Sequence, residues 1–586
     1  MVKYLSSRFP GISFLNKKVF SAIAVCFVFN SVSFAAGIPG GITPGGAMPQ
    51  ISNQPEPLVY PTIKKPKTPK AAPLIDQDPN APRMLLKGFE LYGITDRPEQ
   101  DITLEKIQQL IAAETDAMIP KGNQRLFTVG MFENIAHAIT RYYRARGFFL
   151  ARAYVPEQKV KNGIVKLQIV ESFLDQIVFD GNELYSDESM AILFEDLVDQ
   201  SIYITDIEDA MFRLNEYPGL KASAVFGPGS KPGSAAIVMR TEETPSYNTI
   251  SLDNHGSAYT GETRVLYNHV SNNLFGNADV LAFNLMTTFS PANNQYADVL
   301  YVQPVFKSLF KVGGGARFNS FKVGEELEDL KINGQSIILN GFIDYKLIRT
   351  RNDQLSVLTD LSYKQATSKV VDTTAAEDKV TALRIDTLYS GIDRWLWTAS
   401  HDASLSITLG AAEVLSTLDA DGNSVPGRGD GSFTKINFSY SRMQPTFNLQ
   451  SLLFRFQTQI SSDLLTSLER FSLGGPNNVR AYPVAELLVD EAMFTSFEYI
   501  LRASPEVKQT WLNKLQLSVF FDYAKGDINS PLANETASVT LSGLGVGIQV
   551  EPFNKFRARV DFATATGDEP SDLQSLPFYF SMGYSF

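Results

Sequence analysis

The 586-residue sequence contains one cysteine and four histidines, so it is poor in the side chains on which thiol and metal chemistry depend. Its single cysteine, Cys26, lies within the first 35 residues, and no thiol follows it. A disulfide framework and a zinc site built from cysteines are therefore excluded for the rest of the chain. The histidines do not form the H-E-x-x-H spacing or any other metal-ligand spacing. We expect no metal and no other cofactor.

Long apolar runs and an excess of positive charge are also missing. After residue 35, no run of about 18 apolar residues could cross a bilayer as a helix, so any membrane span is expected to consist of β-strands. The chain carries 52 Lys and Arg against 63 Asp and Glu, which gives a formal net charge of −11. This charge balance argues against nucleic acid as a partner.

The N-terminal segment has the features of an export signal. Basic residues precede an apolar stretch from Val19 to Phe29, and Ser33-Phe34-Ala35 matches a small-x-small cleavage site. We therefore predict that residues 1–35 are a signal peptide. Residues 36–81 are rich in Pro and Gly and show no sustained period, which predicts an extended linker with no chemistry of its own.

Two small α+β domains are predicted after the linker. In residues 82–172, apolar residues at helical spacing follow possible helix caps at Asp101 and Thr128. A turn at Lys161-Asn162-Gly163 then joins two strands, which gives the order β-α-α-β-β. Residues 173–243 repeat this order, so the chain contains an internal repeat.

From residue 244 to residue 586, helical periodicity gives way to short alternating segments. Leu517, Val519 and Phe521, for example, alternate with polar residues such as Asp522. One apolar face, one polar face and long polar loops favour a membrane β-barrel over a soluble β-sandwich. The region is long enough for sixteen strands, because each strand needs only about 9–11 residues to cross. The predicted fold is therefore two α+β domains followed by a transmembrane antiparallel β-barrel.

The last segment fits this prediction, because aromatic and apolar residues alternate up to Phe586. Such a strand can pair with the first strand of the barrel and close the sheet, which removes its exposed edges. We therefore expect Phe586 to mark the end of the barrel.

Two glycine-rich segments resemble nucleotide-binding motifs only superficially. Gly227–Gly233 carries its lysine before the last glycine instead of after it, so we predict a turn there. Gly543-Leu544-Gly545-Val546-Gly547 is followed by no helix and alternates like a strand. Because no other catalytic constellation is present, we predict that the protein is not an enzyme.

The most informative stretch runs from Phe471 to Tyr482. Its Leu473-Gly474-Gly475 and Val479-Arg480-Ala481-Tyr482 resemble the L-G-G-x-x-x-V-R-G-Y signature in the sixth extracellular loop of two-partner secretion transporters, the TpsB family. Asp253-Asn254-His255-Gly256 is similar to the first barrel strand of that family. The order of two POTRA (polypeptide-transport-associated) domains and a barrel also agrees from about residue 84 onward. Ala481 departs from the pattern, which usually has glycine there.

The resemblance implies that the loop near residues 471–490 folds into the barrel, with its bend at Gly474 and Gly475. It also implies that the arginine of the loop meets the aspartate of an F-x-D-x-G strand motif, which is matched by Phe520, Asp522 and Ala524. Strand alternation independently places that aspartate on the lumen face, where a guanidinium group favours a carboxylate partner. The predicted loop lock consists of Val479, Arg480, Tyr482, Phe520 and Asp522.

The resemblance further implies a bacterial outer-membrane translocase with its POTRA domains in the periplasm. These domains would capture an unfolded TpsA-like exoprotein, such as an adhesin, a haemolysin or a contact-dependent toxin, and the barrel would conduct it outward. Strand addition to the POTRA sheet edges suits this capture. Outer-membrane lipid and the barrel assembly machinery are further expected partners. The alternatives are a factor that inserts other barrels, a passive porin and a secreted enzyme.

Overall fold

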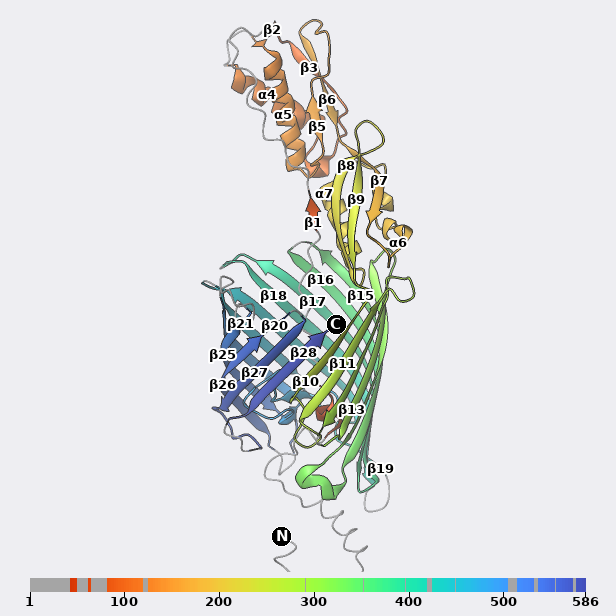
Figure 1. Ribbon diagram of the computed structural model, residues 1–586, viewed down its shortest axis with the longest axis vertical. Helices are drawn as coiled ribbons and strands as arrows, with labels where there is room; N and C mark the ends of the chain where they lie inside the picture. The colour runs from red at the N-terminus through yellow and green to blue at the C-terminus, as the bar shows by residue number, and fades with distance from the viewer. Residues whose placement is uncertain are drawn as a thin grey trace, which may run out of the picture.

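The computed structural model describes thirteen stretches of the chain, and the predicted signal peptide at residues 1–35 lies outside them. In these stretches, two small domains stand in line above a β-barrel (Figure 1). No helix within them is long and apolar enough to cross a membrane. The described residues are 43–49, 62–64, 82–119, 125–289, 291–350, 352–395, 397–418, 424–447, 449–503, 514–531, 536–553, 555–572 and 576–586.

The first domain packs two helices against a three-stranded sheet with the order β3-β6-β5. Thr103 caps the first helix by accepting a hydrogen bond from the Lys106 backbone N–H, so the expected cap at Asp101 was wrong by two residues. Thr128 caps the second helix as the pattern predicted. The elements are β2 (Met84–Leu85), β3 (Gly88–Tyr92), η2 (Pro98–Gln100), α4 (Leu104–Met118), β4 (Leu126–Phe127), α5 (Val129–Ala145), β5 (Arg152–Tyr154) and β6 (Ile164–Val170).

The second domain repeats this plan with a four-stranded sheet of order β1-β8-β9-β7. Its first helix is short and continues as a 3₁₀ turn, and its second helix packs a buried apolar face on the sheet. The elements of this domain are β7 (Phe173–Asp180), α6 (Asp187–Ala191), η3 (Glu195–Leu197), α7 (Ile204–Asn215), β8 (Leu220–Pro228) and β9 (Ser234–Glu243).

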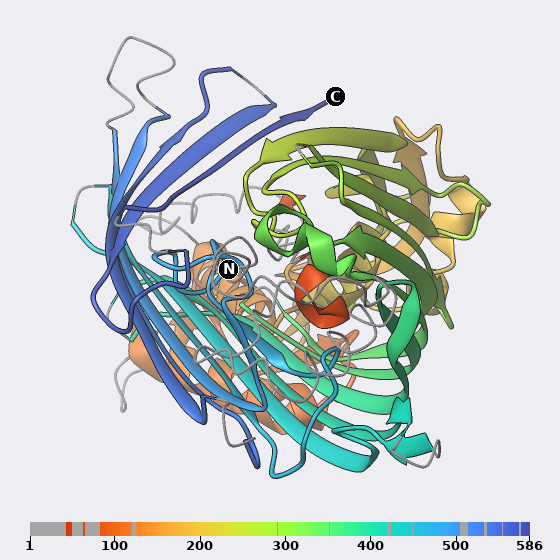
Figure 2. The same ribbon diagram turned by 90° about the horizontal axis from the view of Figure 1, so that it is seen from below.

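Two short segments of the predicted linker are not a free spacer. Strand β1 (Thr62–Lys64) pairs in parallel with β8, and helix α3 (Pro44–Ala47) lies inside the barrel (Figure 2). The carbonyl of Ala47 accepts a hydrogen bond of 2.8 Å from the Asn294 side chain on the barrel wall. The prediction of an extended linker is therefore wrong for these two segments, which form a paired strand and a helix.

Within the described residues, sixteen antiparallel strands close the barrel, and a short strand, β19 (Ser424–Pro426), extends the connection between β18 and β20. Turn η4 (Glu325–Leu330) lies in the connection from β14 to β15. The sixteen strands are β10 (Ser246–Asp253), β11 (Thr263–Asn272), β12 (Val280–Phe289), β13 (Asn294–Val305), β14 (Phe310–Lys322), β15 (Asn333–Arg349), β16 (Asp353–Val370), β17 (Thr373–Asp393), β18 (Ala399–Leu418), β20 (Gly431–Pro445), β21 (Gln450–Ile460), β24 (Glu491–Arg502), β25 (Gln516–Asp527), β26 (Ser538–Val550), β27 (Phe556–Ala565) and β28 (Phe578–Ser585).

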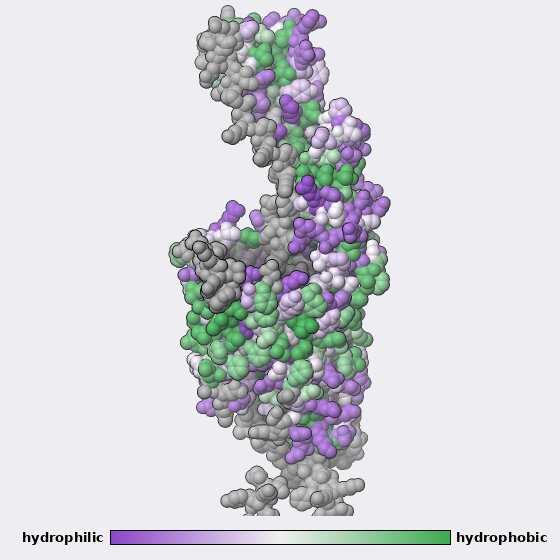
Figure 3. All heavy atoms as spheres, viewed as in Figure 1, coloured by the Kyte–Doolittle hydropathy of each residue, from purple (hydrophilic) through white to green (hydrophobic). Residues whose placement is uncertain are grey.

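The two faces of the barrel differ as the alternation predicted. On β25, Val519 is 49% exposed on the outside, whereas Phe520 is 1% exposed and faces inward. On the face of the barrel seen in Figure 3, hydrophobic residues gather in a band across its middle. An outward apolar band and a polar interior are typical of a barrel that spans a lipid bilayer.

The last strand closes the barrel against the first one. Strand β28 pairs with β10 from Thr249↔Ser585 to Asp253↔Ser581, and the backbones of Asn248 and Phe586 exchange two further hydrogen bonds. The sheet therefore has no free edge where these strands meet.

The second domain is attached to the barrel rim through Glu216, at the end of α7. Its carboxylate lies 2.8 Å from Nζ of Lys346, 3.1 Å from Nε of Arg349 and 3.4 Å from Nζ of Lys311. Burial raises the pKa of Glu216, but these three cations outweigh burial and hold that pKa below its usual value. Charge pairing therefore ties the second domain to strands β14 and β15.

Candidate functional site: a loop folded into the barrel

The connection from β21 to β24, residues 461–490, is the sixth at the barrel end away from the two small domains. It carries a small hairpin of strands β22 (Phe471–Leu473) and β23 (Leu487–Val489). Gly474 and Gly475 follow β22 with φ of 86° and 95°. Both glycines therefore adopt the left-handed conformation that side chains disfavour, which accounts for the bend at this point.

The tip of the loop is buried against the barrel wall. Val479, Ala481 and Tyr482 belong to one apolar cluster with Phe520 and Ala524 of β25. Ala524 is fully buried there, so alanine fits where the family motif has glycine. The structure thus brings the loop residues predicted from the motif onto the strand predicted from alternation.

Arg480 is the centre of the contact between loop and wall, and it is only 2% exposed. Its Nε donates to Oδ2 of Asp522 at 2.8 Å, and its Nη2 donates to Oδ1 at 2.9 Å. Its guanidinium carbon also lies 3.2 Å from the ring centroid of Phe520. A bidentate ion pair combined with stacking on an aromatic ring fixes both the distance and the plane of the guanidinium group.

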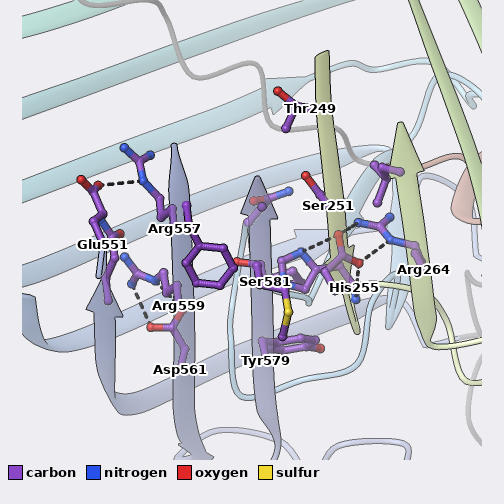
Figure 4. A pocket seen from close by; sticks show the side chains of 18 of the residues that line it. Thr249, Ser251, His255, Arg264, Glu551, Arg557, Arg559, Asp561, Tyr579 and Ser581 are labelled. Carbon is purple, nitrogen blue, oxygen red and sulfur yellow. Dashed lines mark hydrogen bonds and ion pairs between the residues drawn. The ribbon is translucent and has the colours of Figure 1, made fainter. Parts of the chain in front are cut away.

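Three further charged residues extend this pair into a network. Nη1 of Arg480 donates to Glu498 of β24 at 2.9 Å, and Glu498 also accepts from Arg559 of β27 at 2.7 Å. Arg559 in turn pairs with Asp561 at 2.7 Å (Figure 4). The network contains three carboxylates and two guanidinium groups. Sequence reasoning missed Glu498 and the link of the two β27 residues to the loop.

Tyr482 connects the loop to the last two strands. Its hydroxyl donates to the carbonyl of Asp568 at 2.6 Å, and its own carbonyl accepts from the Tyr579 hydroxyl at 2.6 Å. The loop tip therefore contacts the closing strand β28 and the connection that precedes it, as well as β24 to β27.

The base of the loop has a second charged attachment that the sequence did not reveal. Glu469, which is 1% exposed, lies 2.6 Å from Lys364 of β16 and 2.9 Å from Lys435 of β20. Asp490 accepts hydrogen bonds from the Leu465 backbone at 3.0 Å and from the Arg470 side chain at 3.0 Å. Both ends of the inward fold are thus held by buried charges.

Helix α3 packs beside this base. A Cβ added to Gly45 would lie 1.9 Å from the carbonyl oxygen of Ser467, so the helix and the loop are in direct backbone contact. The N-terminal segment and the loop therefore share the lumen.

Next to the loop, a cavity of about 900 Å³ opens into the lumen. Polar side chains of β10, β27 and β28 project into it, among them Ser251, Arg559 and Ser581 (Figure 4). The same lining includes Pro476 and Asn477 of the loop. No cluster of His, Cys, Asp or Glu suited to a metal ion occurs in the described stretches. Leu266, Leu453 and Phe556 also line the cavity, so its wall has both polar and apolar parts.

Comparison with known proteins agrees with this geometry. The family model "Haemolysin secretion/activation protein ShlB/FhaC/HecB" matches residues 233–550, and a ShlB-type POTRA domain model matches residues 98–172. The heme/hemopexin transporter protein HuxB of Haemophilus influenzae is 24% identical over 507 residues, which cover 84% of this chain and 86% of HuxB. The outer membrane transporter CdiB of Dickeya dadantii is 27% identical over 146 residues, 25% of this chain and 26% of CdiB.

Solved structures share the fold. CdiB from Escherichia coli has a TM-score of 0.64 at 16% identity, with 98% of this chain and 100% of that chain covered. BamA from Haemophilus ducreyi, lacking its first three POTRA domains, has a TM-score of 0.50 at 13% identity over 86% of this chain and 100% of its own. The chain belongs to the ShlB/FhaC/HecB haemolysin secretion/activation family of outer-membrane two-partner secretion transporters.

Proposed function

We propose that this transporter secretes one large TpsA-like exoprotein, which its two POTRA domains capture unfolded in the periplasm and its barrel conducts outward. The observation that carries the proposal is the loop tip at Arg480, buried in the lumen of a barrel that bears docking domains at its other end. A passive porin needs no such domains. In this proposal, passage of the exoprotein through the barrel needs no nucleotide and no catalytic group, so the protein acts as a conduit and not as an enzyme.

Sheet edges in the first docking domain support capture by strand addition. Strand β3 is an edge of its sheet, and a groove of about 180 Å³ lies between it and α4. Phe89, Leu91 and Ile111 line this groove. Backbone hydrogen bonds to an edge strand provide affinity, and an adjacent apolar groove receives alternate side chains of an extended chain.

The loop is the element that we infer to control passage. Val479, Arg480 and Tyr482 hold it against Phe520 and Asp522, and its bend at the two glycines keeps it inside the barrel. In this arrangement the loop and α3 both occupy lumen that an exported chain needs, so both must move during secretion.

The outer surface of the barrel carries the remaining proposed partners. Outer-membrane lipid covers the apolar band, and the barrel assembly machinery recognises the strand that ends at Phe586. An alternative function, insertion of other barrels, is suggested by the fold that this chain shares with BamA.

Deletion of the gene tests the proposal against that alternative. Secreted proteins and outer-membrane barrels are quantified in the deletion strain, in its parent and in the deletion strain complemented with the gene. Loss of one large exoprotein with normal barrel levels is the expected result. A general decrease of barrels would instead identify an assembly factor.

A further inference from the structure

The glycine motif that matched no nucleotide site forms part of the wall on which the loop sits. Gly543, Gly545 and Gly547 lie on the lumen face of β26 and alternate with apolar residues that face outward. None of the three has a positive φ, so the backbone would tolerate alanine at each position. The reason for glycine at these positions is therefore space.

Two of these glycines leave room for groups that contact Arg480. A Cβ on Gly543 would lie 2.4 Å from Cβ of Ala481, and a Cβ on Gly545 would lie 2.3 Å from Cζ of Phe520. Carbon atoms in favourable contact are about 3.5–4.0 Å apart, so neither side chain fits. Ala481 follows Arg480 in the loop, and Phe520 stacks on its guanidinium group.

Gly547 faces more adaptable neighbours. A Cβ there would lie 2.3 Å from Oδ1 of Asp561 and 2.6 Å from Oγ of Ser518. Both atoms are ends of side chains that can rotate, whereas Ala481 meets Gly543 with its Cβ, next to the loop backbone. Of these three glycines, Gly543 is thus the one whose added Cβ would meet an atom of the loop itself.

We propose that Gly543 is a positioning residue for the loop and is matched in size to Ala481, so that the two positions together accommodate a single methyl group. Ala481 stands where the family motif has glycine, and the absence of a side chain at residue 543 gives that methyl group its space. This inference rests on the proposed loop lock and identifies the part of the wall that sets the position of the loop.

Trypsin cleavage after Arg480 measures the position of the loop directly. In the purified full-length chain in detergent micelles, we expect the buried Arg480 to be protected from trypsin. Mass spectrometry detects any new N-terminus at Ala481. Gly543→Ala overpacks the contact and is expected to raise cleavage at this bond by about tenfold or more. The double variant Ala481→Gly/Gly543→Ala is expected to restore protection.

A matched control and a second variant complete the experiment. Gly341→Ala on β15 should leave protection unchanged, because a Cβ there would meet its nearest atom at 3.9 Å. Ala481→Val enlarges the side chain at the same contact from the loop side and keeps the barrel wall intact, so it tests the proposal even if Gly543→Ala does not assemble. All variants are compared at equal heat-modifiable barrel content.

Two results would overturn the size matching: full protection in Gly543→Ala or in Ala481→Val, and cleavage in Gly543→Ala that Ala481→Gly does not reverse. Cleavage with undiminished export of the exoprotein has a different meaning. It would confirm that residues 481 and 543 position the loop and would refute the loop as a lock.

Discussion

The pair of Arg480 and Asp522 provides the sharpest test of the lock. Both side chains are buried, at 2% and 0% exposure. Removing one partner of such a pair leaves an uncompensated buried charge, which costs about 3–5 kcal/mol. Since about 1.4 kcal/mol corresponds to a factor of ten, the ratio of seated loop to released loop would fall by at least about 100-fold.

The wider network predicts that both single variants release the loop. Arg455 of β21 joins the network through the Ser496 hydroxyl, which accepts from Arg455 at 3.2 Å and from Arg480 at 3.5 Å. Three guanidinium groups therefore face three carboxylates, and either single variant leaves one charge without a partner. The double variant removes one charge of each sign and is expected to be little worse than either single variant, because the two residues act as one unit.

The assay is the amount of exoprotein in the medium, normalised to heat-modifiable barrel in the outer membrane. Arg480→Lys is the matched control, because it keeps the charge and loses the bidentate geometry, and it should give an intermediate defect. Fully additive defects in the double variant would refute the reasoning. Equal secretion by Arg480→Ala and the wild type would refute it as well.

Three further predictions concern other parts of the chain. Removal of residues 82–243 should abolish secretion and leave the barrel inserted, which secretion assays and heat-modifiability can check; undiminished export would contradict the docking role. Deletion of Phe586 should lower the heat-modifiable barrel fraction, and an unchanged fraction would mean that this residue only faces lipid. Because the folded pKa of Glu216 is lowered from 4.5, its ion pairs stabilise docking above that value and lose their effect as pH falls through the folded pKa. Glu216→Gln should therefore broaden the distribution of distances between spin labels on the second domain and on the barrel rim at neutral pH. The broadening that the wild type shows on acidification should be absent in this variant. An unaltered distance would show that Glu216 does not hold the domain.

Much of the fold follows from local periodicity. Alternation along β25 is enough to place Val519 outside and Phe520 inside, since successive side chains of a strand point to opposite faces. The same alternation places Asp522 on the lumen face. The resemblance to the TpsB family adds that Arg480 meets this aspartate, and in the structure Nε of Arg480 lies 2.8 Å from Oδ2 of Asp522.

The contacts that sequence reasoning missed depend on which strands become neighbours. Glu498 joins Arg480 because β24 pairs with β25, and its opposite residue in that pairing is Phe520. Thr62 pairs with Ser223 although the Pro- and Gly-rich segment around it has no period. Register between distant segments is set by the assembled sheet, so no local pattern could indicate either contact.

The composition of the lock explains how one loop can be both held and released. A buried ion pair is not more stabilising than well-packed apolar residues of similar volume. Its groups, however, can be hydrated again when the loop moves into a water-filled lumen, whereas an entirely apolar contact would expose its full surface to water. Val479 and Phe520 add apolar contact only around the charges, and Gly543 leaves room for the methyl group of Ala481. In the proposed lock, shape therefore sets the position of the loop, and the charged network is the part that allows its release.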